Sequence, residues 1–477
     1  MLFTSPIFLF LFLPAVMLSY VIVPRKHRRH AIFVYNVLFS VCANFHRLVN
    51  LLLMTSVILL AYATGISIQK QKRSKTIVTY ASLMVLSLLL VRSIASLLYI
   101  IDFKFYPLGL SVYVLLAISY VVDVYRGDSE AGSFFDVALY VSFFPIIICG
   151  PFVKYKSFRL LVSDDAIKPS SESFATGILL FAFGFIKKIG ISAVFVETYE
   201  KLIPIGDGGY SIVLLFVISA LIFLAIYFGF SGYSDMSSGL SHMLGIELPS
   251  DGGNVFVTLA SPSRYVSGFL ASLGDWMDDY VREPIVRYLT SHAKDENRTR
   301  YIVFVSSFVR AFCICAWFKS TPPILLIIAP LALVVATEDA FLHKRRYMRS
   351  RLVYLPTAIF TFIIISAFWA FMKDGGVSRL IQDLAGASFI GLEEQIYEMM
   401  SSLFSTKTLL SFAASVFCLL ISIGNTRSLI LSSATGNALA LRTAVSIVIL
   451  LAFLACILIY LPQYPIYSTV PFKDFAM

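Results

Sequence analysis

The chain has 477 residues, of which 58% are hydrophobic and only 14% charged, and its mean hydropathy is +0.84. The surface of a soluble protein does not accommodate so many apolar residues, so the composition predicts a polytopic membrane protein and excludes a soluble globular enzyme. The formal net charge of +10 is compatible with nucleic-acid binding, but basic residues also accumulate in the cytoplasmic loops of membrane proteins. We therefore expect membrane lipid, and no nucleic acid, as a partner.

The N-terminal segment, residues 5–23, is predicted to be a retained first transmembrane helix. It is long enough to cross about 30 Å of hydrocarbon, and the basic residues 25–30 follow it rather than precede it. A secretory signal peptide has the opposite order. Because basic loops stay in the cytoplasm, the N-terminus is expected outside, and the basic stretches 69–75, 292–300 and 343–351 are expected on the cytoplasmic side.

Apolar segments of similar length recur along the chain and predict about a dozen transmembrane helices. They occupy residues 31–44, 48–68, 76–91, 107–124, 174–195, 211–230, 301–318, 323–341, 352–372, 403–423 and 444–461. Within the segment 174–195, Lys187 and Lys188 are expected to mark an inner edge or an amphipathic portion. No soluble domain separates the segments, so residues 1–477 are predicted to form a single all-α membrane domain.

Residues 134–153 differ from the other apolar segments because Pro145 and the pair Gly150-Pro151 interrupt them. Proline removes a backbone hydrogen bond, and broken helices are tolerated at membrane depth only where protein or water satisfies the freed groups. We therefore expect a broken or re-entrant helix that lies against the polar motif of residues 231–235.

Polar and ionisable residues cluster between the apolar segments of residues 227–319. Such groups are costly in hydrocarbon, so their default interpretation is a functional cavity inside the protein. The candidates are Ser231, Tyr233, Ser234, Asp235, His242, Arg264, Asp275, Arg310, Trp317 and Lys319. A position at the bilayer surface is the alternative, and it is the favoured one for Asp278, Asp279, Arg282 and Glu283.

The six cysteines lie in or beside apolar segments without the spacing of metal ligands or of a disulfide framework, so they are interpreted as small buried residues. No metal site is predicted. Gly-rich phosphate loops and Gly-x-Ser-x-Gly nucleophile elbows are absent from the sequence, which leaves soluble NTPase and hydrolase mechanisms without support.

Three sequence blocks together resemble the membrane-bound O-acyltransferase family. They are PLGLSVYVLLAISYVVDVYRG at residues 107–127, FFDVALYVSFFPIIICGPFVKYKSF at 134–158 and YFGFSGYSDMSSGLSHMLGIELP at 227–249. The likeness is greatest to the bacterial branch for O-acetylation of alginate and related exopolysaccharides, which the opening of the chain and residues 368–386 also resemble. The resemblance implies a bacterial inner-membrane protein with broken and re-entrant helices around a central tunnel, through which acyl groups pass from a cytoplasmic donor to an extracytoplasmic acceptor or partner.

Two histidine positions of the family motifs hold other residues here. Family members read Trp-His-x-Ser-Leu before a Trp-(Leu)-x-Asp-Tyr block, and FLASL before WMDDY places Leu270 at the first histidine. The motif Leu-Trp-His-Gly, which carries the catalytic histidine of the family, falls on AWFK and places Phe318 at that histidine. A neutral imidazole accepts a proton from an attacking hydroxyl, whereas a phenyl ring has no lone pair and cannot act as the base.

Two residues are candidates for a replacement base. His242 is near the core motif and shares a helix face with Asp235, about two turns away. Lys319 is the other, because a desolvated lysine can lose its proton and act as a base. Each also has a simpler interpretation: a basic residue without a catalytic role for His242, and a side chain extended to the membrane surface for Lys319.

Two functions therefore remain open. The chemistry favours a catalytically degenerate O-acyltransferase-like protein that serves as scaffold, anchor or regulator of an exopolysaccharide-modifying assembly. The alternative is an active O-acyltransferase with a relocated base. No cofactor is expected, apart from an acyl thioester donor such as acetyl-CoA if the protein is active, and extracytoplasmic or membrane partner proteins are expected in both cases. An ion-coupled transporter is disfavoured because repeated halves with broken helices are not seen.

Overall fold

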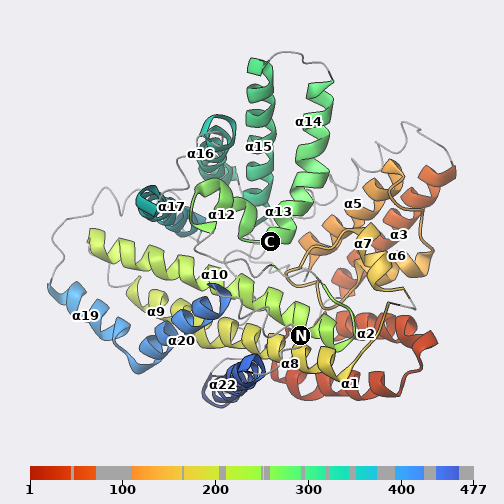
Figure 1. The fold of residues 1–477 in the computed structure, drawn as a ribbon, viewed down its shortest axis with the longest axis horizontal. Helices are drawn as coiled ribbons and strands as arrows, with labels where there is room; N and C mark the ends of the chain where they lie inside the picture. The colour runs from red at the N-terminus through yellow and green to blue at the C-terminus, as the bar shows by residue number, and fades with distance from the viewer. Residues whose placement is uncertain are drawn as a thin grey trace.

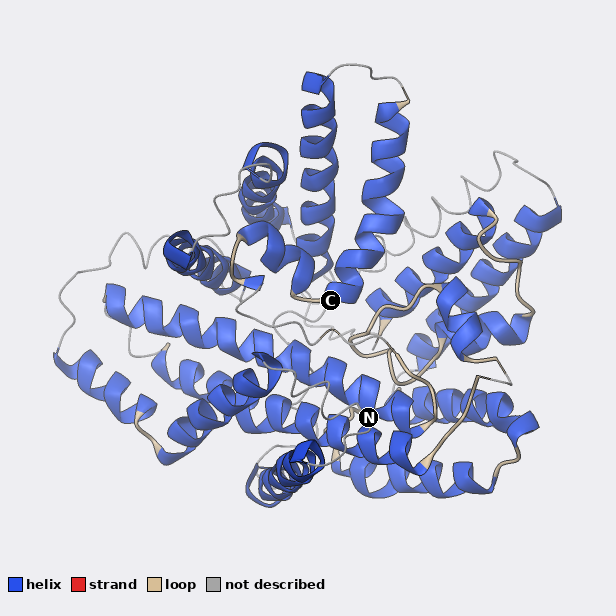
Figure 2. Cartoon of the chain, viewed as in Figure 1, coloured by secondary structure: helices blue, strands red, loops and turns tan. Residues whose placement is uncertain are grey.

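The computed structural model describes residues 1–44, 48–70, 109–163, 166–203, 211–248, 251, 258–291, 296–318, 322–342, 351–372, 393–423 and 437–460. Within these ranges the regular elements are all helices, joined by turns and loops (Figure 2). The predicted all-α fold is confirmed for this part of the chain.

The first third of the chain contains η1 (Phe8–Phe12), α1 (Leu13–Ile22), η2 (Arg25–His27), α2 (Arg28–Ala43), α3 (Leu48–Lys70), α5 (Leu110–Arg126), α6 (Phe134–Val141) and α7 (Tyr155–Leu161). The centre contains α8 (Ser171–Phe185), the π-helical segment η3 (Ile186–Ser192), α9 (Ala193–Leu202) and α10 (Ile212–Met243). Next come α12 (Pro262–Gly268), α13 (Ala271–Met277), η5 (Asp278–Arg282), α14 (Glu283–Thr290), α15 (Glu296–Phe318), α16 (Pro322–Thr337) and η6 (Glu338–Leu342). The C-terminal part contains α17 (Arg351–Met372), α19 (Glu393–Leu403), α20 (Thr406–Ile423) and α22 (Asn437–Tyr460).

The helices α8 and α10 lie side by side in the middle of the molecule (Figure 1). They run antiparallel, since Gly177 of α8 faces Gly239 of α10 and Gly184 faces Gly232. A Cβ atom added to Gly232 would lie 2.6 Å from the carbonyl oxygen of Gly184, and one added to Gly239 would lie 2.6 Å from that of Gly177. The two backbones touch at these points, which only glycine permits.

We expect Gly232→Ala to destabilise the protein, because its new methyl group would meet backbone rather than a flexible side chain. Overpacking of this kind typically costs about 1–3 kcal/mol. Thermal unfolding in detergent should show a lowered midpoint. Val213→Ala, on the exposed face of the same helix, is the matched control and should change the midpoint much less. Equal midpoints for wild type and Gly232→Ala would contradict the close contact.

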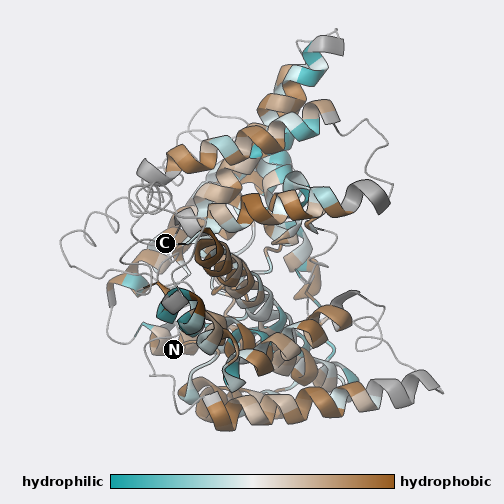
Figure 3. Cartoon of the chain, turned by 90° about the vertical axis from the view of Figure 1, so that its left-hand side faces the viewer, coloured by the Kyte–Doolittle hydropathy of each residue, from teal (hydrophilic) through white to brown (hydrophobic). Residues whose placement is uncertain are grey.

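The structure is that of a multi-pass helical membrane protein. Among the described residues, four helices are long and apolar enough to cross a membrane, or up to five if α19 and α20, bent by 60°, form one broken span. The four are Val49–Lys70, Ser171–Leu202, Ile212–Met243 and Arg298–Phe318, and apolar residues run along most of the other helices too (Figure 3). The count of about a dozen spans stays a prediction. One predicted segment, 76–91, lies outside the described residues.

The predicted break within residues 134–153 is confirmed. Helix α6 begins with a capping box formed by Ser133 and Asp136, and it ends at Val141, ahead of Pro145. Turns and an extended stretch follow, with a cis peptide between Gly150 and Pro151. Since the chain leaves the helix here, its backbone groups need partners from elsewhere in the protein. One is α10, whose Ser237 hydroxyl donates to the carbonyl oxygen of Pro145.

Candidate functional site

The polar motif lies inside one continuous helix. The predicted apolar span ended at residue 230, but α10 continues through the motif to Met243. Serine and glycine are weaker helix formers than alanine, so packing of the motif against α8 and η3 maintains the helix here. The side chains of Ser231, Tyr233, Ser234 and Asp235 are all buried. These four side chains thus lie inside the protein, and their role in a functional cavity stays a prediction.

A buried ion pair joins η3 to this motif. The ammonium group of Lys187 lies 2.6 Å from Asp235 Oδ2 and donates a second hydrogen bond to Ser231 Oγ at 2.9 Å. The side chains of Lys187 and Asp235 are 3% and 1% exposed. The Lys187 ammonium also lies 4.3 Å from the centre of the Phe183 ring. Charge neutralisation inside the pair makes the burial of both groups possible.

The expectation that Lys187 and Lys188 mark an inner edge or an amphipathic portion of their segment is wrong. Both side chains are buried in the middle of the Ser171–Leu202 helix, within its π-helical segment. The Lys188 ammonium lies 5.5 Å from the centre of the Tyr233 ring, so both lysines face α10. Two adjacent residues of a regular α-helix point in directions about 100° apart, and the wider π-helical turn alters that arrangement.

We expect Asp235→Asn to destabilise the protein by about 3–5 kcal/mol, because the Lys187 ammonium would stay buried without its counter-charge. The double variant Lys187→Met with Asp235→Leu removes both charges and should recover much of that loss. Thermal unfolding in detergent measures both. Glu283→Gln, which breaks an exposed pair with Arg287, is the control and should cost at most about 1 kcal/mol. A double variant no more stable than Asp235→Asn would contradict the pairing.

A second polar connection links α10 with α13 and the broken segment. Ser234 Oγ lies 3.4 Å from Asp251 Oδ2, and Asp251 accepts hydrogen bonds from the Ser272 amide at 2.6 Å and the Ser272 hydroxyl at 2.8 Å. The Ser272 hydroxyl in turn accepts from the amide of Phe152 at 2.8 Å. Sequence reasoning missed Asp251 and Ser272, since neither stands out from its neighbours in the sequence.

His242 lies near the C-terminal end of α10, where its side chain is half-buried. Its Nδ1 is 2.9 Å from the carbonyl oxygen of Ser238, and its own carbonyl accepts a hydrogen bond from the Ser173 hydroxyl at 2.7 Å. The hydrogen bond from Ser173 joins the start of α8 to the end of α10 through the backbone carbonyl of His242. The contact of the imidazole is to its own helix.

Arg310 of α15 is buried and forms ion pairs with two aspartates. Its guanidinium lies 3.0 Å from Asp278 and 3.4 Å from Asp339. Asp339 also accepts a hydrogen bond from the Ser263 hydroxyl at 2.6 Å, and Glu338 accepts one from the Ser263 amide at 3.0 Å. Asp278 is thus paired with an interior arginine. The assignment of Asp278 to the bilayer surface did not predict this pairing.

The position assigned to the catalytic histidine of the resemblance holds an aromatic core residue. Phe318, at the end of α15, is 5% exposed. Its ring centre lies 5.2 Å from that of Phe230, 6.1 Å from Phe269 and 5.0 Å from both Trp317 and Trp369. Trp317, another sequence candidate, packs on Phe152 with ring centres 5.6 Å apart. Aromatic contacts of this kind stabilise a packed interior.

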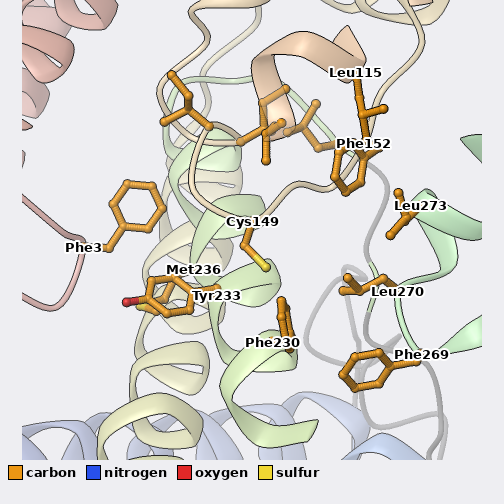
Figure 4. Close-up of a cluster of buried hydrophobic side chains, with 14 of the residues drawn as sticks. Phe3, Leu115, Cys149, Phe152, Phe230, Tyr233, Met236, Phe269, Leu270 and Leu273 are labelled. Carbon is orange, nitrogen blue, oxygen red and sulfur yellow. The ribbon is translucent and has the colours of Figure 1, made fainter. Parts of the chain in front are cut away.

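Leu270, at the position assigned to the first motif histidine, is buried at the start of α13. Figure 4 shows it among apolar side chains, with Phe269 and Leu273 on one side and Cys149, Phe230 and Tyr233 across from them. Leu270 and Phe318, the residues assigned to the two motif positions, thus belong to one apolar interior.

The remaining sequence candidates divide into two groups. Arg264 and Asp275 are exposed at the surface of the protein. Lys319 lies outside the described residues. Within the part of the chain that the structure describes, no three histidine, cysteine, aspartate or glutamate side chains gather as metal ligands would.

Several membrane helices thus surround a buried polar motif and an adjoining apolar interior, which is the organisation of an integral membrane protein with an internal site. Residues 38–372 match the model of MBOAT, the membrane-bound O-acyltransferase family. This match covers more than half of the chain, and the chain therefore belongs to that family.

The chain is similar to curated proteins whose names refer to alginate, peptidoglycan and teichoic acid. The chain is 29% identical over 306 residues to the probable alginate O-acetylase AlgI of Azotobacter vinelandii, and the match covers 59% of each protein. It is 21% identical over 313 residues to the peptidoglycan O-acetyltransferase of Helicobacter pylori, covering 59% of this chain and 56% of the relative. A teichoic acid D-alanyltransferase of Lacticaseibacillus rhamnosus is 22% identical over 285 residues, covering 55% and 69%. The chain thus spans less than two thirds of the length of the alginate relatives it matches.

Proposed function

We propose that this protein is a catalytically degenerate membrane-bound O-acyltransferase of envelope polysaccharide modification, which acts as a scaffold, anchor or regulator of a membrane assembly. The observation that carries the proposal is the surroundings of Phe318, which lies among four aromatic rings at the position assigned to the family's catalytic histidine. Extracytoplasmic or membrane partner proteins belong to the proposal, because a scaffold without catalysis acts through its partners.

The chemistry of acyl transfer gives the reason. A hydroxyl acceptor attacks an acyl thioester only as its proton leaves, so a base within hydrogen-bond reach of the hydroxyl is needed. Neither Phe318 nor Leu270 offers a lone pair. The resemblance to the family implies a central tunnel, and we infer that in this chain the rings of Phe230, Phe269 and Phe318 narrow it to an apolar constriction. Such a constriction disfavours a polar acceptor.

An active O-acyltransferase with a relocated base is the second candidate, and it would pass acyl groups from a donor such as acetyl-CoA to a polysaccharide or extracytoplasmic partner. The burial of Lys187, Lys188 and Asp235 beside the same interior favours it, because ionisable groups are costly at membrane depth and often mark functional sites. The ion pair also has a structural explanation, since it joins η3 to α10. For this reason we rank the scaffold first.

The purified protein should transfer acetyl groups from acetyl-CoA at most slowly, because loss of a general base typically lowers the rate about 100- to 10,000-fold. Release of free CoA and acetylation of added alginate measure the reaction. Phe318→His alone should restore little, since Leu270 and the surrounding rings remain. The scaffold proposal would be wrong if the wild type were active and Lys319→Ala or His242→Ala abolished the activity with folding intact. Lys168→Ala, at an exposed lysine, is the control.

A complementation experiment tests the scaffold itself. Cells that lack this chain should show altered acylation or export of their envelope polysaccharide. A variant that carries both Lys319→Ala and His242→Ala should restore the wild-type polysaccharide, because a scaffold needs neither side chain as a base. Failure of this variant, at wild-type abundance in the membrane, would favour the relocated-base enzyme.

We further propose that the protein resides in the bacterial inner membrane with its N-terminus outside and its basic segments in the cytoplasm. A single cysteine introduced as Lys26→Cys, in an otherwise cysteine-free chain, should not react with a membrane-impermeant maleimide in intact cells. It should react after the cells are opened. Labelling from outside in intact cells would reverse the proposed orientation.

A further inference from the structure

A cavity of about 220 Å³ lies between α9 and the bend that separates α19 from α20. Figure 1 shows these three helices together at one end of the molecule. Five of the residues that line the cavity carry hydroxyl groups, and three are charged. The charged residues are Glu197 and Lys201 of α9 and Lys407 of α20.

The charge of the cavity favours an anion. Lys201 and Lys407 contribute two positive charges, and Glu197 is the carboxylate among the lining residues. The Lys201 ammonium lies 2.7 Å from the Glu197 carboxylate, and their side chains are 62% and 38% exposed. An ion pair this exposed holds its partners weakly, so Lys201 can turn to a ligand at small cost. Lys407 also interacts electrostatically with Glu197, and the three charged side chains together carry one net positive charge.

The hydroxyl groups of the cavity are held in place by the bend. Ser405 caps α20 by accepting a hydrogen bond from the Thr408 amide at 3.3 Å. Thr408 Oγ1 donates to the carbonyl oxygen of Ser402 at 3.0 Å and lies 3.2 Å from Thr198 Oγ1 of α9. The cavity is therefore built from fixed hydroxyls of two elements together with the start of α20, whose amide groups also favour negative charge.

The cavity also lies where a membrane lipid would place its headgroup. Residues of α9 that line it occupy the last turns of the candidate span Ser171–Leu202. Helix α20 starts at the cavity and exposes a row of apolar side chains, namely Leu409, Leu410, Val416 and Leu420, which are 46% to 61% exposed. A headgroup in the cavity would thus have acyl chains beside an apolar helix surface.

We propose that this cavity binds the phosphate group of an anionic phospholipid, with the acyl chains of the lipid along α20. Lys201 and Lys407 neutralise the phosphate, and the hydroxyl of Ser405 orients it. Such a lipid would hold α19 and α20 against α9 and secure the bend between them. The site is independent of acyl transfer and of the proposed scaffold function.

Lipid retention by the purified full-length protein tests the proposal. Native mass spectrometry from nanodiscs with equal amounts of phosphatidylglycerol and phosphatidylcholine should show preferential retention of phosphatidylglycerol. Lys201→Gln with Lys407→Gln should lower that affinity roughly 25-fold, about fivefold for each lysine near the membrane surface. The control variant, Lys156→Gln with Lys168→Gln, removes two exposed lysines elsewhere and should retain the lipid as the wild type does.

Two kinds of result would contradict the lipid site. Equal retention of the two lipids, or phosphatidylglycerol retention unchanged in the Lys201 and Lys407 variant, would overturn the site. Thermal stabilisation by inorganic phosphate in detergent, equal to that by short-chain phosphatidylglycerol, would show a free-phosphate site and overturn the lipid. If the double variant misfolds, Lys407→Gln alone serves, with an expected loss of about fivefold.

Discussion

Two charges that are buried in a membrane protein have to neutralise each other, and the packing around Lys187 and Asp235 follows from that constraint. The pair forms only if η3 lies directly on α10. The short distance between Lys187 and Asp235 in turn requires the backbones of α8 and α10 to touch. Glycines at the contact points allow this close approach. The ion pair and the glycine contacts therefore depend on one another, and together they fix the position of the polar motif.

The interior around Phe318 and the pair of helices α8 and α10 are stabilised by separate sets of contacts. The interior around Phe318 and Leu270 is held by aromatic and aliphatic contacts, while the α8 and α10 pair is held by its own backbone contacts and ion pair. An imidazole buried among aromatic rings would need a hydrogen-bond partner, whereas a phenyl ring packs there without one. A phenyl ring at position 318 is thus compatible with this interior without a polar partner.

The sequence predicted most of what depends on local pattern. Helices such as α3, α10 and α15 follow from long apolar segments, and the break near Pro145 follows from the chemistry of proline. It did not predict that Lys187 pairs with Asp235, since side-chain contacts between distant segments have no signal in a single sequence. Asp251 was not predicted either, because its partner Ser272 belongs to another element. An adjacent pair of lysines also resembles a membrane-surface charge until its buried partner is known.

The length of α10 has a consequence for where chemistry or partner binding can occur. Its 32 residues extend about 48 Å, well beyond the roughly 30 Å of hydrocarbon in a bilayer. Asp235 lies about 35 Å along the axis from the Ile212 end, whose apolar side chains Val213 and Phe216 are exposed. If that end marks one boundary of the hydrocarbon, the buried ion pair lies close to the opposite headgroup layer. A molecule that approaches from that side would have a shorter path to the motif than one that has to cross the bilayer from the other side.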